Sequence, residues 1–158
     1  MAGMIGRMVL FAVLNFGALA IGGRFTAAGV GSTWYAGLAK APWTPPGWVF
    51  GAAWTVVMLG FTWFMAAVTG PGPGPNRRVC LAAYALSWVL NVAWNPLFFT
   101  AHRTGWALVD IAALLVLIGG MAWTGRAASG GAVLGAVPYV VWLTVATSLN
   151  AYIVVANR

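Results

Sequence analysis

Five long apolar stretches constrain this chain more than any other feature of its sequence. They run from about 8 to 28, 48 to 69, 79 to 99, 106 to 124 and 131 to 156. Each is long enough to cross roughly 30 Å of hydrocarbon as a helix that rises about 1.5 Å per residue. Because the stretches are apolar throughout and do not alternate, they are not strands of a membrane barrel. We predict an all-α integral membrane protein, a five-transmembrane-helix bundle.

The composition supports one multi-pass domain over residues 1–158. Hydrophobic residues make up 62% of the chain and charged residues only 6%, which is more apolar surface than a soluble domain could bury. Glycine-rich or polar breaks separate the apolar stretches, and the longest break, about 29–47, lies between the first two. We therefore expect the lipid bilayer to be the main partner of the chain.

The basic residues are scattered, although the formal net charge is +7. They form no basic stripe interleaved with aromatic residues, so nucleic acid is not an expected partner. We interpret them as loop charges that contact anionic headgroups. With five spans they divide equally and leave the membrane orientation open, because one face would carry Arg7, Arg77, Arg78 and Arg126 and the other Arg24, Lys40, Arg103 and Arg158.

The reactive residue types are too few for most catalytic centres. Cys80, His102 and Asp110 are single examples of their kinds, and the chain has no glutamate. This excludes an internal disulfide, a cysteine-rich metal site and a pair of catalytic carboxylates. We predict no metal site and no required cofactor. For Asp110 we expect a structural role with a hydroxyl, an indole N–H or an arginine such as Arg103 as its partner, rather than a role in ligand binding.

Tryptophan is the residue type in excess, with ten copies. Those near the ends of the apolar stretches fit an interfacial belt, as for Trp34, Trp43, Trp48, Trp106 and Trp123. Trp54, Trp88 and Trp142 lie deeper in their stretches, where the belt does not explain them.

Helical spacing aligns the deep tryptophans with small or amide side chains on three faces. These faces are Gly47, Gly51, Trp54 and Met58; Tyr84, Trp88, Asn91 and Asn95; and Pro138, Trp142, Ala146 and Asn150. An asparagine in hydrocarbon needs a polar partner. The faces therefore indicate either interhelical packing joined by amides or a pocket for a large planar apolar ligand. The sequence leaves both interpretations open.

The break at 29–47 contains the stretch KAPWTPPGWVFGAAW, in which Pro42, Pro45 and Pro46 restrict the backbone. One interpretation is a preformed lid that carries Trp34, Tyr35, Trp43 and Trp48 over the mouth of the bundle. The other is a proline-rich turn whose tryptophans anchor it in the membrane interface.

Several motifs in order resemble the TspO/translocator protein family, the tryptophan-rich sensory proteins also known as peripheral benzodiazepine receptors. They are WYAGLAKAPWTPPGWVFGAAW, LNVAWNPLFF, GWALVD, PYVVW and ATSLN, and they extend over nearly the whole chain. The chain departs from the family pattern at Ala41 and Ala52, where prolines are usual, and at Met58, where tyrosine is common.

The resemblance implies a membrane receptor or translocator that binds porphyrins, such as protoporphyrin IX, and related planar apolar ligands in a tryptophan-lined pocket, for sensing, regulation or transport. It also implies a homodimer. The residues that match the pocket are Trp34, Tyr35, Trp43, Pro45, Trp48, Trp54, Asn91, Trp94, Trp142, Ala146 and Asn150, to which our own helical spacing adds Trp88.

Alternative functions stay open at this stage. The resemblance also allows an enzyme that degrades porphyrin with light and oxygen, for which Trp54 and Trp142 are the candidate catalytic residues. A sterol is a weaker candidate ligand, because Leu149, Tyr152 and Arg158 fit only a loose sterol motif. Small-residue pairs on two helices suggest dimer contacts, namely Ala83 with Ser87 and Ala18 with Gly22.

Overall fold

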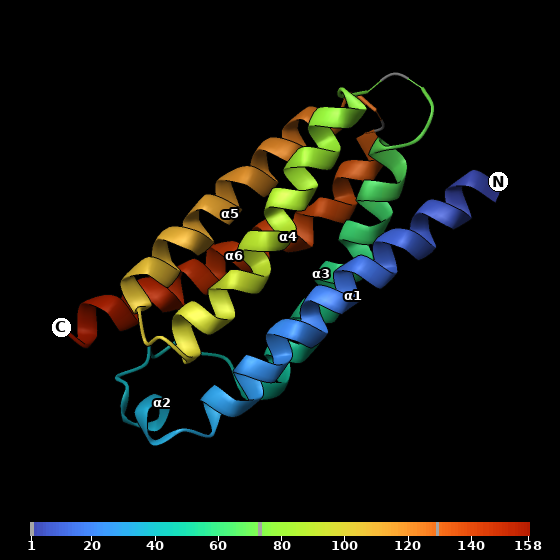
Figure 1. Cartoon of the computed structure of the whole chain (residues 1–158). Helices are drawn as coiled ribbons and strands as arrows, with labels where there is room; N and C mark the ends of the chain where they lie inside the picture. The colour runs from blue at the N-terminus through green and yellow to red at the C-terminus, as the bar shows by residue number, and fades with distance from the viewer. Residues whose placement is uncertain (1, 73, 129) are drawn as a thin grey trace.

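All five apolar stretches are helical in the computed structural model, which describes residues 2–72, 74–128 and 130–158. The long helices are α1 (Ala2–Val30), α3 (Gly47–Val68), α4 (Arg77–Phe99), α5 (Thr104–Gly125) and α6 (Gly130–Ala156). A short helix, α2 (Thr33–Gly37), lies in the break between α1 and α3 (Figure 1). The described residues contain no strand. The all-helical fold is therefore confirmed.

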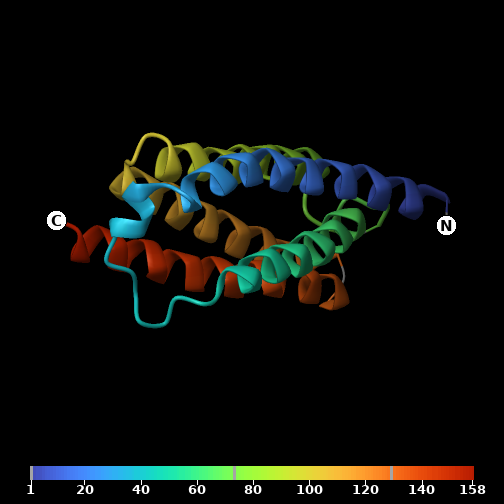
Figure 2. The ribbon, with the colours of Figure 1, turned by 90° about the horizontal axis from the view of Figure 1, so that it is seen from below.

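The long helices form a closed ring of neighbours. Around the ring, α1 packs against α3, α3 against α6, α6 against α5, α5 against α4, and α4 against α1. Figure 2 shows the ring from another side, with α3 and α6 together and α1 alongside α4. The segment that contains α2 lies at the same end of the bundle as the C-terminus, and the N-terminus lies at the opposite end (Figure 1).

Four of the long helices are long and apolar enough to cross a membrane: α1 from Gly3, α3, α5 and α6. Within the described residues, α4 does not meet the same criterion of length and mean hydropathy. It begins with Arg77 and Arg78 and carries Asn91 and Asn95 further along, which lowers its average apolarity. The structure thus supports four candidate membrane spans by length and composition, and the expected count of five transmembrane helices stays a prediction.

The outer surface of the bundle is apolar. Val116 is 76% exposed and Leu134 is 67% exposed, and exposed large apolar side chains also occur along α1, α3 and α4. The interior is apolar as well, with Phe64, Met65 and Leu143 fully buried. A surface of this kind is stable in contact with lipid and not with water. The chain is an integral membrane protein.

The backbones of α3 and α6 approach each other closely at two glycines. A Cβ atom added at Gly60 would lie 2.5 Å from the carbonyl oxygen of Gly135, and one added at Gly135 would collide with the carbonyl oxygen of Gly60. The two glycines therefore allow direct contact between backbones, as small residues do in membrane helix pairs.

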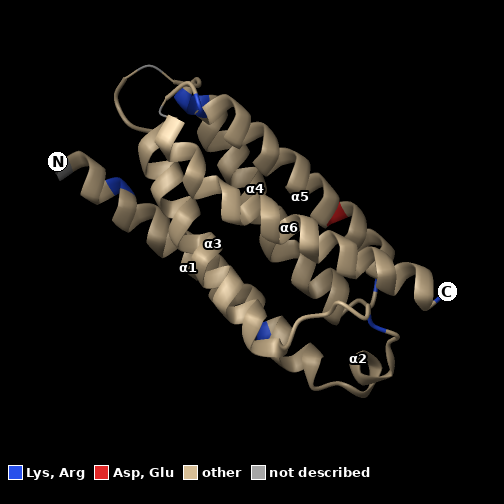
Figure 3. Ribbon diagram, turned by 180° about the vertical axis from the view of Figure 1, so that it is seen from behind, with Lys and Arg blue, Asp and Glu red and all other residues tan. Residues whose placement is uncertain are grey.

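Charged residues lie mainly near the two ends of the bundle, and the single acidic residue lies part of the way along α5 (Figure 3). Arg7 explains why α1 begins earlier than expected. Its Nε donates to the carbonyl oxygen of Ala66 at 2.8 Å, which ties the first turns of α1 to the end of α3.

The small-residue pairs proposed for dimer contacts pack inside one chain, which corrects that part of the interpretation. Ser87 and Ala18 are buried at 2% and 3% exposure. Gly22 faces Asn95 of α4, since a Cβ atom there would lie 2.5 Å from the Asn95 amide nitrogen. These residues bring α1 and α4 of the same chain together, and a homodimer stays a prediction that needs another surface.

Candidate functional site

Aromatic side chains gather at the α2 end of the bundle. Ser32 caps α2 by accepting a hydrogen bond from the Tyr35 backbone N–H at 3.1 Å. The helix places the indole of Trp34 in a stack on His102, with ring centroids 3.9 Å apart, and edge-on to Phe98. Tyr35 lies against Phe98 as well, and the Lys40 ammonium sits 4.5 Å from the centroid of its ring. Burial raises the pKa of Tyr35 above its ordinary value, so its hydroxyl is neutral.

The proline-rich segment that follows α2 is attached to the C-terminal part of α6. The Trp43 indole N–H donates to the hydroxyl of Ser148 at 3.1 Å, and its ring meets Tyr152 edge-on. Ala39 and Asn157 exchange two hydrogen bonds, of 2.9 and 3.1 Å. The segment is therefore fixed to one helix of the bundle, and whether it acts as a lid over a ligand stays a prediction.

Trp94 and Asn150 form a direct link between α4 and α6. The Trp94 indole N–H donates to the side-chain oxygen of Asn150 at 3.1 Å. The amide nitrogen of Asn150 donates to the Thr104 carbonyl oxygen of α5 at 2.9 Å. Trp94 also stacks on Phe98, which connects this link to Trp34 and Tyr35. Thus two of the residues that the sequence assigns to the pocket are in contact with each other.

A second group lies deeper in the bundle. Asn91 donates to the hydroxyl of Tyr139 at 2.6 Å, and Trp54 meets the Tyr139 ring edge-on at 5.8 Å. Trp88 donates its indole N–H to the Leu14 carbonyl oxygen of α1 at 2.9 Å. The amides of Asn91 and Asn150 therefore join helices to one another, which supports the packing interpretation for these two residues.

Asn15 belongs to this polar interior and was missed by the sequence analysis. It accepts a hydrogen bond from the Tyr84 hydroxyl at 2.8 Å and donates to the Thr62 hydroxyl at 3.0 Å. The three side chains come from α1, α4 and α3, and all are buried. The sequence did contain a signal for Asn15, because an asparagine in the middle of an apolar stretch needs a polar partner.

Trp142 is more buried than the other tryptophans whose contacts are described above. It is 7% exposed and packs edge-on against Phe50 of α3 at 5.3 Å. Its indole N–H has no hydrogen-bond partner in the described part of the chain. Trp43, Trp88 and Trp94 all have acceptors, so Trp142 is a buried tryptophan whose indole N–H is unpaired among the described residues.

The remaining pocket candidates are less buried. Trp48 exposes 75% of its surface, as expected for an interfacial tryptophan, while Pro45 and Ala146 are half-buried. The loose sterol motif is not one lipid-facing surface, because Leu149 is buried and Tyr152 lies against Trp43.

Asp110 lacks the partner that the sequence analysis expected. It is 9% exposed in α5, and within the described residues its Oδ2 atom has no hydrogen bond and no cation pairs with it. The prediction of a capping hydroxyl, indole or arginine was therefore wrong for this oxygen. Arg103 lies outside the start of α5, at the N-cap position.

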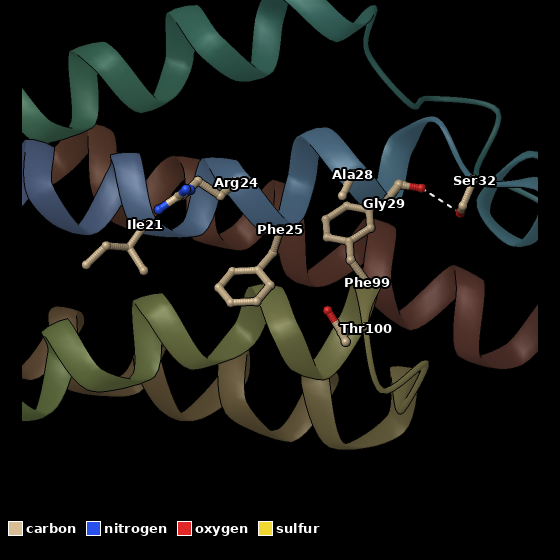
Figure 4. A pocket seen from close by; sticks show the side chains of 8 residues that line it. All are labelled: Ile21, Arg24, Phe25, Ala28, Gly29, Ser32, Phe99 and Thr100. Carbon is tan, nitrogen blue, oxygen red and sulfur yellow. Dashed lines mark hydrogen bonds between the residues drawn. The ribbon is translucent and has the colours of Figure 1, made fainter.

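A hollow of about 580 Å³ lies elsewhere, between the last turns of α1 and the end of α4. Its walls include Arg24, Phe25 and Ala28 from α1, and Phe99 and Thr100 from the α4 end (Figure 4). The pocket residues expected from the sequence do not line it. A much smaller hollow inside the bundle touches Trp88 and Asn91, together with Asn15 and Tyr139.

Comparison with known proteins gives consistent similarities over most of the chain. The TspO/MBR family matches residues 8–156. The chain is 38% identical over 136 residues to the Translocator protein of Bos taurus, covering 82% of this chain and 78% of that protein. It is 33% identical over 147 residues to Protein CrtK of Rhodobacter capsulatus, covering 90% and 89%. It is 34% identical over 117 residues to the Tryptophan-rich sensory protein of Cereibacter sphaeroides, covering 74% and 72%.

Proposed function

Because the chain belongs to the TspO/MBR family, we propose that it is a membrane receptor or translocator that binds porphyrins, with protoporphyrin IX as the representative ligand. The proposed pocket lies between α3, α4 and α6, beneath residues 29–47. Trp54, Trp94 and Trp142 would supply flat apolar surface for the macrocycle. The aromatic groups around Trp34 and Trp43 would border the entrance.

The observation that carries this proposal is the buried Trp142 indole N–H without an acceptor. Leaving such a donor buried and unpaired costs about 1 to 3 kcal/mol. The amides of Asn91 and Asn150 already bond to neighbouring helices and are not comparable donors. Protoporphyrin IX carries propionate groups at one edge of an apolar ring, so it would offer Trp142 an acceptor while filling an aromatic pocket.

We expect Trp142→Phe to weaken protoporphyrin IX binding by about tenfold, which corresponds to roughly 1.4 kcal/mol. The substitution keeps an aromatic ring and removes the N–H donor. Affinity is measured from the shift of porphyrin absorbance on titration with purified protein in lipid nanodiscs. Trp123→Phe is the matched control, because Trp123 is 66% exposed on α5 and stacks under Arg126. Equal affinities for Trp142→Phe and the parent would contradict the proposal.

The same titration tests the alternative of a porphyrin-degrading enzyme. The porphyrin complex is illuminated in air, with dioxygen as the oxidant of the macrocycle, and the spectrum is followed. A receptor gives the same slow bleaching with the parent and with a Trp54→Phe, Trp142→Phe double variant. Product bands that appear with the parent and vanish in the double variant would favour the enzyme.

We further propose that α4 is the fifth transmembrane helix. It has 23 residues and packs between α1 and α5, both of which are long and apolar enough to span. Its outward side chains are apolar, since Val79, Leu86 and Val89 are each more than half exposed. Its polar Ser87 and Asn91 are buried. This is the arrangement expected for a membrane helix whose polar groups face the bundle.

Single-cysteine labelling tests the position of α4. In a Cys80→Ala background, Pro71→Cys and Ala101→Cys place thiols at exposed positions before and after α4. In sealed vesicles of uniform orientation, we expect a membrane-impermeant maleimide to label only one of the two variants from outside. Labelling of both from the same side would show that α4 does not cross.

A further inference from the structure

We propose that the hollow between α1 and α4 binds an anionic phospholipid, with the phosphate at Arg24 and an acyl chain along the apolar wall. The hollow is open to the outside of the bundle, where lipid surrounds the protein, and Figure 4 shows the rings of Phe25 and Phe99 between the two helices. Arg24 and the Thr100 hydroxyl supply hydrogen-bond donors at the same site.

Arg24 has no acidic partner within the chain. The only acid is Asp110, which is buried in α5, and α5 is not a neighbour of α1 in the ring. A guanidinium group has five N–H donors that match the geometry of a phosphate group. Its counter-charge must therefore come from outside the chain, and the bilayer is the nearest source.

Arg24 lies far enough along α1 for its long side chain to extend from the edge of the hydrocarbon to the headgroups. From Arg7 to Arg24 along α1 the rise is about 26 Å, at about 1.5 Å per residue. From Trp106 to Trp123 along α5 the rise is also about 26 Å, and both of these tryptophans are about two-thirds exposed, as in an interfacial belt. Each pair thus spans a length close to the hydrocarbon thickness of a bilayer. Arg24 lies near the α2 end of α1.

The lining of the hollow favours a phospholipid over free phosphate and an anionic headgroup over a zwitterionic one. Phe25, Ala28 and Phe99 form a mainly apolar wall that free phosphate would not use. A zwitterionic headgroup also carries a cation, and no aspartate or glutamate side chain is among the described residues that line the hollow. Phosphatidylglycerol, with one negative charge and no amine, has the matching chemistry.

Native mass spectrometry of the purified protein tests this site with phosphatidylglycerol and phosphatidylcholine as probes. For the parent we expect retention of phosphatidylglycerol about tenfold above phosphatidylcholine. Arg24→Gln should abolish the preference, because it removes the charge but keeps a polar side chain that can donate hydrogen bonds. Arg78→Gln, at an exposed arginine on the opposite end of α4, is the matched control and should keep the preference. An unchanged preference in Arg24→Gln would overturn the proposal.

A second variant tests the location of the acyl chain. Ala28→Trp fills the hollow from an exposed position on α1 and should reduce the retention of both lipids at this site. Its unfolding midpoint in detergent is compared with that of the parent, and if it is lowered, Ala28→Phe replaces it. Retention equal to that of the parent in a folded variant would contradict the site. Efficient disulfide cross-linking between chains with Ala28→Cys in the Cys80→Ala background would show that a second copy covers the hollow, which also overturns the proposal.

Discussion

Gly60→Ala is expected to destabilise the bundle by about 3 kcal/mol, at the upper end of the range for overpacking a tight interior contact. The new methyl group would lie 2.5 Å from the Gly135 carbonyl oxygen, which is backbone and cannot rotate away. The helices α3 and α6 would have to separate, although they share one of the most extensive packing interfaces in the ring. The midpoint of unfolding on titration with sodium dodecyl sulfate in mixed micelles measures the loss.

Gly51→Ala is the matched control for this prediction. Gly51 is in the same helix and is exposed, and an added Cβ atom would meet nothing within 4 Å. Because alanine has the higher helix propensity, the unfolding midpoint should stay the same or rise slightly. If Gly60→Ala and Gly51→Ala behave alike, the α3–α6 backbone contact does not contribute to stability.

Asn15→Ala is expected to cost about 3 kcal/mol, because it leaves the buried hydroxyls of Tyr84 and Thr62 without their amide partner. The loss should be smaller in a triple variant that combines Asn15→Val, Tyr84→Phe and Thr62→Val. In that variant all three polar groups are replaced by apolar ones, so no buried donor or acceptor is left unpaired.

The same detergent titration compares the two variants. A triple variant that is less stable than Asn15→Ala would mean that packing volume, rather than hydrogen bonding, determines the contribution of this cluster. The comparison therefore distinguishes the stability that comes from the hydrogen bonds between α1, α3 and α4 from the stability that comes from the surrounding apolar contacts.

The sequence predicted the helices well because membrane helices have a strong local signal. A long apolar run is sufficient to identify α3, α5 and α6 to within about two residues. The early start of α1 could not be predicted in this way, because it depends on Arg7 reaching the Ala66 carbonyl oxygen of another helix. The short α2 is too brief for periodicity, and its cap at Ser32 is seen only in the structure.

Contacts between helices were harder to predict than the helices themselves. The spacing of Tyr84, Trp88 and Asn91 correctly indicated an inward face of α4, since Tyr84 and Asn91 are buried and Trp88 is half-buried. It could not identify their partners, because Asn15, Tyr139 and Leu14 come from helices distant in sequence. The small-residue pairs failed for the same reason. A pattern on one helix does not specify whether its neighbour belongs to the same chain or to another.

The attachment of the proline-rich segment to α6 has a consequence for the route of a guest molecule. If the segment covers the proposed pocket, entry from the water at this end requires the release of Ala39 from Asn157 and of Trp43 from Ser148, three hydrogen bonds in all. At about 0.5 to 1.5 kcal/mol each, this is a barrier of a few kcal/mol before any new contact forms. A ligand already dissolved in the bilayer would not have to break these three hydrogen bonds if it entered between the sides of the helices. For a ligand that is poorly soluble in water, the membrane would then be both the source of the ligand and its route of entry.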